Sequence, residues 1–175
     1  MRGKRRKERM ILKNATLHIG NGEVFQGDMR IADGKIVEVG KNINGDESRS
    51  LNGKHVFPGF IDSGNFLGAQ DMAFFAKDYN ENSNPVTPYL DIWHSIDPDE
   101  LSLQELYKAG ITSMLVTPGN EGILGGTCTV VKTKGKNINK ITVKRDAAMK
   151  ASMTSEVIRV FSGKGSPQTP MALIA

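Results

Sequence analysis

The first third of the chain is marked by short runs in which apolar and polar residues alternate. These runs are residues 11–19, 29–32, 35–39 and 54–57. Asp33 and Gly34 separate the second run from the third. An Asp-Gly pair between alternating runs is typical of a β-hairpin, because both central positions of its turn need a positive φ. The intervening residues 40–52 are polar and contain glycine, as expected of a loop. The pattern predicts that residues 10–57 form a small β-sandwich layer.

Beyond residue 57 the pattern changes to apolar runs separated by a helical segment. Residues 61–67 and 111–117 predict buried strands. Between them, apolar residues recur at helical spacing, namely Leu101, Leu103, Leu106 and Tyr107. Asp97 is a plausible N-cap for this helix, Pro98 suits its first position and Gly110 ends it. A strand, a helix and a second strand in this order predict a βαβ unit.

The connection over residues 68–97 shows no clear periodicity and is interrupted by asparagines and prolines. A connection of this length is usually functional or mobile. In a barrel of alternating strands and helices, the loops that follow the strands carry the active site. We therefore expect this connection to contain a substrate-facing loop.

The last third of the chain begins with a glycine-rich turn over residues 119–126. We expect a strand over 127–133 and another short strand over 139–143. Residues 147–161 are mixed and predict a partly helical segment, and the final residues 167–175 predict the start of a further helix.

The positive charge is concentrated at the N-terminus. Six of the first ten residues are basic and only Glu8 is acidic. The rest of the chain therefore has 17 of the 23 basic and 18 of the 19 acidic residues and is close to neutral. Residues 1–9 could contact nucleic acid or an anionic surface, or form a solvated, disordered arm. We favour the disordered arm, because no aromatic residues lie between the charges as stacking platforms for bases. A nucleic-acid partner is therefore not expected.

The composition and the cysteine count are those of a globular protein of a reducing compartment. A chain with 38% hydrophobic and 24% charged residues has enough apolar side chains for a core. Cys128 is the single cysteine, so an intrachain disulfide is excluded. Lys13 and Asn14 interrupt the apolar residues after the basic arm, which argues against a signal peptide. No run approaches the roughly 20 apolar residues that span a bilayer. We expect a cytoplasmic location and no membrane contact.

The stretch over residues 56–68 carries the clearest motif, Val-Phe-Pro-Gly-Phe-Ile-Asp-Ser-Gly-Asn-Phe-Leu-Gly. From Pro58 to Asp62 it resembles the first barrel strand of the amidohydrolase superfamily, which typically reads Pro-Gly-Phe-Ile-Asp-x-His-x-His. Further segments resemble imidazolonepropionase-like and related amidohydrolases in the same order along the chain. These segments are residues 84–88 with 96–98, 109–112, 117–119 with 125–126, and 131–135.

This resemblance implies an α/β fold in two parts after the basic arm of residues 1–9. Residues 10–57 are similar to the composite β domain that precedes the barrel in many amidohydrolases. Residues 58–175 are similar to the first part of the metal-dependent hydrolase barrel, a partial TIM-barrel-like (β/α) unit. A full barrel needs eight strands and roughly 250 residues, and we expect about two to four of those strands here.

The chain departs from the family at the two histidines of the first strand, where Gly64 and Phe66 stand. In the family these histidines bind a divalent metal such as zinc, which lowers the pKa of water and polarises a carbonyl. Gly64 has no side chain and Phe66 has no lone pair to offer. Asp62 keeps its place in the motif but cannot build the site alone, and Asn65 points to the opposite face of a regular strand. We therefore expect no metal cofactor on this chain.

The other ligands of the family usually lie on later barrel strands, and we expect this chain to end before those strands. The three histidines, His18, His55 and His94, do not replace them, because no two are at ligand spacing along the sequence. An exposed or structural role is the better interpretation for each. Cys128 is similarly interpreted as a small buried residue rather than as a nucleophile.

The glycine-rich turn over residues 119–126 has two possible interpretations. As a phosphate-binding loop it lacks a Walker lysine, and its spacing differs from that of a dinucleotide fingerprint. As a loop at the barrel rim it would place Asn120 and Glu121 beside a pocket, together with Asp62 and Asn65 of the first strand. We favour the barrel-rim interpretation.

Three hypotheses for function follow. The favoured one is a degenerate or truncated amidohydrolase-like protein, a pseudoenzyme without catalytic activity on its own; the family activity would be metal-dependent hydrolysis of a non-peptide C–N bond. The alternative is a non-catalytic or half-barrel subunit that pairs with another copy or another chain, which would cover the open barrel edge and form an amidohydrolase assembly. The third is a nucleic-acid binder acting through the basic arm.

Overall fold

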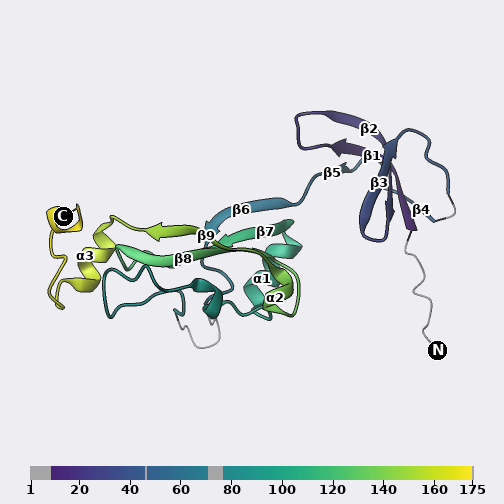
Figure 1. Cartoon of the computed structure of the whole chain (residues 1–175). Helices are drawn as coiled ribbons and strands as arrows, with labels where there is room; N and C mark the ends of the chain where they lie inside the picture. The colour runs from purple at the N-terminus through teal and green to yellow at the C-terminus, as the bar shows by residue number, and fades with distance from the viewer. Residues whose placement is uncertain (1–8, 46, 71–76, 175) are drawn as a thin grey trace, which may run out of the picture. The chain divides into compact units, whose positions relative to one another are not determined.

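The computed structural model of the chain describes residues 9–45, 47–70 and 77–174. It divides into two compact units, Met1–Pro58 and Gly59–Ala175, referred to below as the N-terminal and C-terminal units. Figure 1 shows their secondary structure. No helix within the described ranges is long and apolar enough to cross a membrane.

The N-terminal unit is built on one mixed β-sheet. Its strands are β1 (Arg9–His18), β2 (Val24–Ala32), β3 (Lys35–Gly40), β4 (Ser48–Ser50) and β5 (His55–Val56). They lie in the order β3-β2-β1-β4, and β5 also pairs with β1. β1 is antiparallel to β2 but parallel to β4 and β5. The described residues of this unit form this single sheet, so they do not provide the second layer of the expected sandwich.

The β2–β3 hairpin confirms the turn predicted from Asp33 and Gly34, which have φ values of 51° and 73°. Alternate residues of β1 point to the same side of the sheet, and on this side Ala15 and Leu17 are buried with Met29 of β2. These three side chains form the core of the N-terminal unit.

The C-terminal unit contains a four-stranded sheet in the order β6-β7-β8-β9. The strands are β6 (Phe60–Asn65), β7 (Ile111–Val116), β8 (Leu124–Lys132) and β9 (Thr142–Ala151). β6 and β7 are parallel, and they are joined through the 3-10 helix η1 (Ile92–Ser95) and helix α1 (Leu101–Lys108). This order confirms the predicted βαβ unit, but β6 is mostly exposed and is not the buried strand that was expected over residues 61–67. β8 and β9 are antiparallel to their neighbours, so they do not continue the all-parallel strand order of a barrel.

Several predicted boundaries in the C-terminal unit are wrong. α1 begins at Leu101, because Asp97 caps an isolated turn by accepting from the Asp99 N–H at 2.9 Å, and Glu100 takes the N-cap position. Residues 139–143 are not a separate strand. Their first part lies in helix α2 (Ile138–Ile141), and β9 follows directly. In the segment 147–161, helix is confined to α3 (Ser155–Phe161), which is followed by α4 (Pro170–Ile174).

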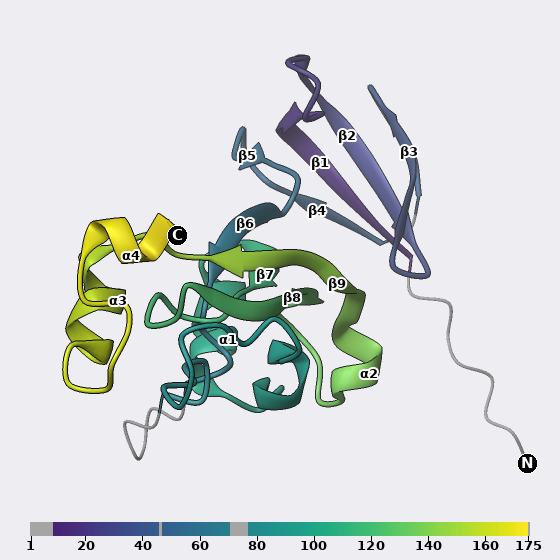
Figure 2. The same ribbon diagram turned by 60° about the vertical axis from the view of Figure 1, so that its left-hand side comes forward.

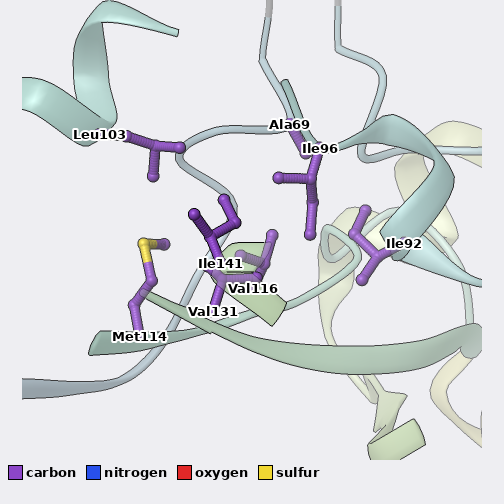
Figure 3. Close-up of a cluster of buried hydrophobic side chains, with 8 residues drawn as sticks. All are labelled: Ala69, Ile92, Ile96, Leu103, Met114, Val116, Val131 and Ile141. Carbon is purple, nitrogen blue, oxygen red and sulfur yellow. The ribbon is translucent and has the colours of Figure 1, made fainter. Parts of the chain in front are cut away.

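One face of the C-terminal sheet carries the main core (Figure 3). Its buried side chains come from the sheet, from α1 and α2, and from the β6–α1 connection (residues 66–100): Ala69, Ile92, Ile96, Leu103, Met114, Val116, Val131 and Ile141. Figures 1 and 2 both show α1 and this connection on the same side of the sheet. Burial of each large side chain contributes about 1.5–3 kcal/mol, so this core fixes the described parts of the connection, residues 66–70 and 77–100, which contain little secondary structure.

Candidate functional site

The candidate site predicted from the sequence lies at the carboxyl end of β6. Asp62 accepts a hydrogen bond from the Gly64 N–H at 2.9 Å, and its other oxygen accepts one from the Asn65 side-chain amide at 2.5 Å. The pairing of β6 with β7 shifts register between Asp62 and Asn65. Because the strand is irregular there, the Asn65 side chain reaches Asp62, and the expectation for a regular strand does not apply.

Gly64 and Phe66 occupy different surroundings at this strand end. A Cβ atom added to Gly64 would lie 3.4 Å from Cγ2 of Thr117, at the limit of ordinary van der Waals contact, so a Cβ atom could be accommodated. Phe66 follows the strand and stacks on Tyr79 of the β6–α1 connection, with ring centroids 4.1 Å apart and an interplanar angle of 20°. Phe66 therefore serves to hold this connection.

The residues at the end of β6 do not fit a divalent metal ion. Both carboxylate oxygens of Asp62 already accept hydrogen bonds. Gly64 offers no donor atom, and Phe66 offers only a ring already stacked on Tyr79. Within residues 9–45, 47–70 and 77–174 no group of three or more histidine, cysteine or acidic residues is placed to hold a metal ion.

Glu121 is a buried carboxylate in the turn between β7 and β8, with 6% of its surface exposed. It accepts hydrogen bonds from Nζ of Lys77 at 3.1 Å and from the side-chain amide of Asn82 at 2.7 Å. The hydrogen bond and the charge of Glu121 raise the pKa of Lys77. The neighbouring Asn120 accepts from the hydroxyl of Ser152 at 3.4 Å. These contacts connect the turn to the β6–α1 connection and to the segment after β9.

A cavity of about 360 Å³ lies beside the β6–α1 connection. Its lining includes Tyr79, the stacking partner of Phe66, together with Tyr89, Asp91 and His94 of the same connection. The lining also includes Pro118, which follows β7, and Gly125 of β8. The cavity therefore lies against the carboxyl-terminal side of β7, where the loops of a (β/α) unit bind ligands.

Asp91 anchors the wall of this cavity to β9. Its carboxylate forms an ion pair with Arg145 and accepts from the Trp93 N–H at 2.9 Å. The Arg145 guanidinium also lies over the Trp93 ring, 4.4 Å from its centroid. The Trp93 indole N–H donates to the Thr142 hydroxyl at 3.0 Å. No local sequence pattern indicates this cluster, because 54 residues separate Asp91 from Arg145.

In the N-terminal unit, the fold brings together two histidines that are 37 residues apart in the sequence. Nε2 of His18 lies 2.8 Å from Nδ1 of His55. Phe57 stacks on both rings, with centroid distances of 4.0 Å to His18 and 6.1 Å to His55. His94 lies in the other unit, edge-on to Trp93. No two histidines are at ligand spacing along the sequence, but the fold brings His18 and His55 together across 37 residues.

Comparison with known proteins supports the resemblance at the level of the fold. No protein-family model matches the sequence, and no curated protein matches it. The structure is similar to a crystal structure of an amidohydrolase from Thermotoga maritima MSB8, with a TM-score of 0.84 and 29% sequence identity. The match covers 94% of this chain and 44% of that chain, so this chain spans less than half of the length of that protein. The mixed α/β structure described here is therefore similar to part of an amidohydrolase.

Proposed function

We propose that this chain is an amidohydrolase-like pseudoenzyme, degenerate or truncated, without catalytic activity of its own. In this proposal residues 10–57 correspond to the β-sandwich layer of the family, and residues 58–175 to the first part of its TIM-barrel-like unit. Asp62, Asn65, Asn120 and Glu121 then belong to the rim of a pocket that has lost its metal.

The stack of Phe66 on Tyr79 carries this proposal. Hydrolysis of a non-peptide C–N bond in the family depends on a metal that activates water, and the metal needs ligands with lone pairs. Phe66 supplies an aromatic ring at one ligand position and uses it to hold the β6–α1 connection. Gly64 supplies no ligand at the other. A group that could bind the metal is thus replaced by one that stabilises the loop.

The proposal is tested by metal analysis and hydrolysis assays on tag-free protein. The double variant His18→Gln/His55→Gln is measured beside the natural chain, because these two neighbouring histidines could bind metal independently of β6. We expect no stoichiometric zinc, manganese or nickel in the double variant, and no turnover of cyclic or linear amides by either protein with these metals added. One ion per chain in the double variant, or turnover by the natural chain, would contradict the proposal.

Introducing histidine at both positions tests whether these two ligands alone are missing or the rest of the catalytic site as well. An added Cβ atom can be accommodated at Gly64, whereas Phe66→His removes the stack on Tyr79. We expect the double variant Gly64→His/Phe66→His to remain inactive, because two histidines and Asp62 do not supply the remaining ligands of the family. Detectable hydrolysis by this variant would show that the chain retains the rest of a catalytic site.

A second candidate function is that of a subunit in an amidohydrolase assembly. The observation that favours it is the exposure of apolar side chains on both edge strands of the C-terminal sheet: Ile61 on β6 is 75% exposed, and Val143 and Met149 on β9 are 56% and 50% exposed. Another copy or another chain that paired with these edges would cover them.

A further inference from the structure

We propose that His18 and His55 form a two-histidine chelate for a divalent transition-metal ion, with Cu²⁺ as the preferred ion. The two facing nitrogen atoms, Nε2 of His18 and Nδ1 of His55, are 2.8 Å apart. Imidazole nitrogens are ligands for copper, nickel and zinc. The site lies within the N-terminal unit and does not depend on the function proposed for the end of β6.

The backbone brings the two histidines together although 37 residues separate them. β5 pairs in parallel with β1, with Thr16 opposite His55. The Thr16 N–H donates to the Lys54 carbonyl at 3.0 Å, which fixes β5 beside the end of β1. His18 ends β1 and His55 begins β5. The chelate would therefore bridge two strands of one sheet.

Phe57 gives the pair a defined orientation. Its ring is stacked on His18 with an interplanar angle of 17° and lies at 15° to the ring of His55. The stack keeps the two imidazoles side by side in the free protein, and binding of an ion then requires each ring to rotate. His55 is exposed and His18 is half-buried, so an ion can reach both nitrogens from solvent.

The choice of ion rests on ligand chemistry. The 2.8 Å between the facing nitrogens is the length of the hydrogen bond that joins the two rings, and binding of an ion replaces this hydrogen bond. Square-planar or tetragonal nitrogen sites are typical of Cu²⁺ and Ni²⁺, and Cu²⁺ binds most tightly among the divalent ions. Each ring must turn so that both lone pairs converge on the ion, and water would fill the remaining positions.

The test is a Cu²⁺ titration of tag-free full chain by calorimetry, with a weak competing chelator to suppress adventitious binding. His18→Gln, His55→Gln and their double variant are compared with the natural protein. His94→Gln is the matched control, because His94 is an exposed histidine of the other unit. Circular dichroism without metal establishes that each variant is folded, and electron paramagnetic resonance counts the nitrogen ligands of the bound Cu²⁺.

We expect one saturable Cu²⁺ site with two imidazole nitrogens, and weaker binding of Zn²⁺. Each single variant should weaken Cu²⁺ binding by about tenfold or more, since even the loss of a residue that only orients a ligand costs 10–100-fold. His94→Gln should bind as the natural protein does. Unchanged Cu²⁺ affinity in the folded double variant, the absence of a saturable site in the natural protein, or an equal loss in His94→Gln would overturn the proposal.

Discussion

Asp91 is the residue that connects the wall of the cavity to β9. Burial alone would raise the pKa of its carboxyl group, but the hydrogen bonds from Arg145 and from the Trp93 N–H, together with the charge of Arg145, lower the pKa below its ordinary value. A carboxylate with a lowered pKa in the folded state stabilises the fold when ionised. This contribution is present above about pH 4, the ordinary range of an aspartate, and is lost as pH falls through the lower folded pKa.

Asp91→Asn removes the charge and keeps the shape of the side chain. We expect a loss of about 1–2 kcal/mol in the free energy of unfolding at pH 7, because the lost hydrogen bond involves a charged group and the partner Arg145 is partly solvated. The difference from the natural protein should shrink as pH falls below about 4 and through the lowered folded pKa, where the natural carboxylate becomes protonated. Urea titrations followed by Trp93 fluorescence measure this unit alone, since the chain has one tryptophan.

Asp99→Asn is the matched control, because Asp99 is an exposed aspartate of the same connection. It should leave the free energy of unfolding nearly unchanged at both pH values. If Asp91→Asn were as stable as the natural protein at pH 7, or if its deficit did not diminish in acid, the ion pair would not stabilise the connection.

At this scale the sequence singles out residues but not their partners. Gly64 and Phe66 stand out because the motif that residues 58–62 resemble has histidine at these two positions. The contacts of Phe66 with Tyr79 and of Asp91 with Arg145 depend on how a connection without periodicity folds onto the sheet. His18 and His55 meet only because β5 pairs with β1 in parallel, and no local pattern marks a parallel pairing across a loop.

Gly126 determines how closely the β6–α1 connection approaches β8. It has a φ of +104°, and an added Cβ atom would lie 2.5 Å from the carbonyl oxygen of Leu90. The next residue, Thr127, donates its N–H to that same oxygen at 2.8 Å. Glycine is needed here for two reasons, since both the backbone conformation and the space exclude a side chain.

Gly126→Ala should therefore destabilise the C-terminal unit. The positive φ alone costs about 1–3 kcal/mol for a residue with a side chain, and displacement of Leu90 adds to this cost. We expect a corresponding decrease in the free energy of unfolding measured by Trp93 fluorescence in urea. Gly163→Ala is the control, because a Cβ atom there meets nothing within 4 Å, and it should change stability by less than about 0.5 kcal/mol. Equal stability of the two variants would contradict this role of Gly126.

Elements with a strong local signal were predicted well, and elements set by tertiary contacts were not. The Asp33-Gly34 turn and the β6–α1–β7 order follow from turn chemistry and periodicity. The start of α1 was placed too early, because Asp97 can cap either a turn or a helix. Strand β9 was missed because most of its residues are exposed, so its sequence lacks the alternation that a half-buried strand shows. β9 forms because it pairs with β8, and its local sequence alone does not predict a strand.

At the scale of the whole molecule, the free edges of the C-terminal sheet are its least protected feature. β6 and β9 each have one neighbour within this four-stranded sheet. An unpaired edge strand with apolar side chains is a template for pairing with another chain. Lys144 and Lys150 on β9 oppose such pairing because charged edge residues discourage it, whereas Ile61 on β6 is 75% exposed. The β6 edge is therefore the better surface for association.

The chain should associate through the β6 edge in a concentration-dependent way. Light scattering after size-exclusion chromatography at several concentrations should give a mass that rises above that of one chain. Ile61→Lys should return the mass to that of a monomer, because a charge at this edge must be desolvated on pairing. Val37→Lys is the matched control, since Val37 is an exposed residue on β3, an edge strand of the N-terminal sheet. A monomer at all concentrations would contradict the subunit hypothesis. Dissociation by Val37→Lys but not by Ile61→Lys would assign the association to the N-terminal sheet and not to the β6 edge.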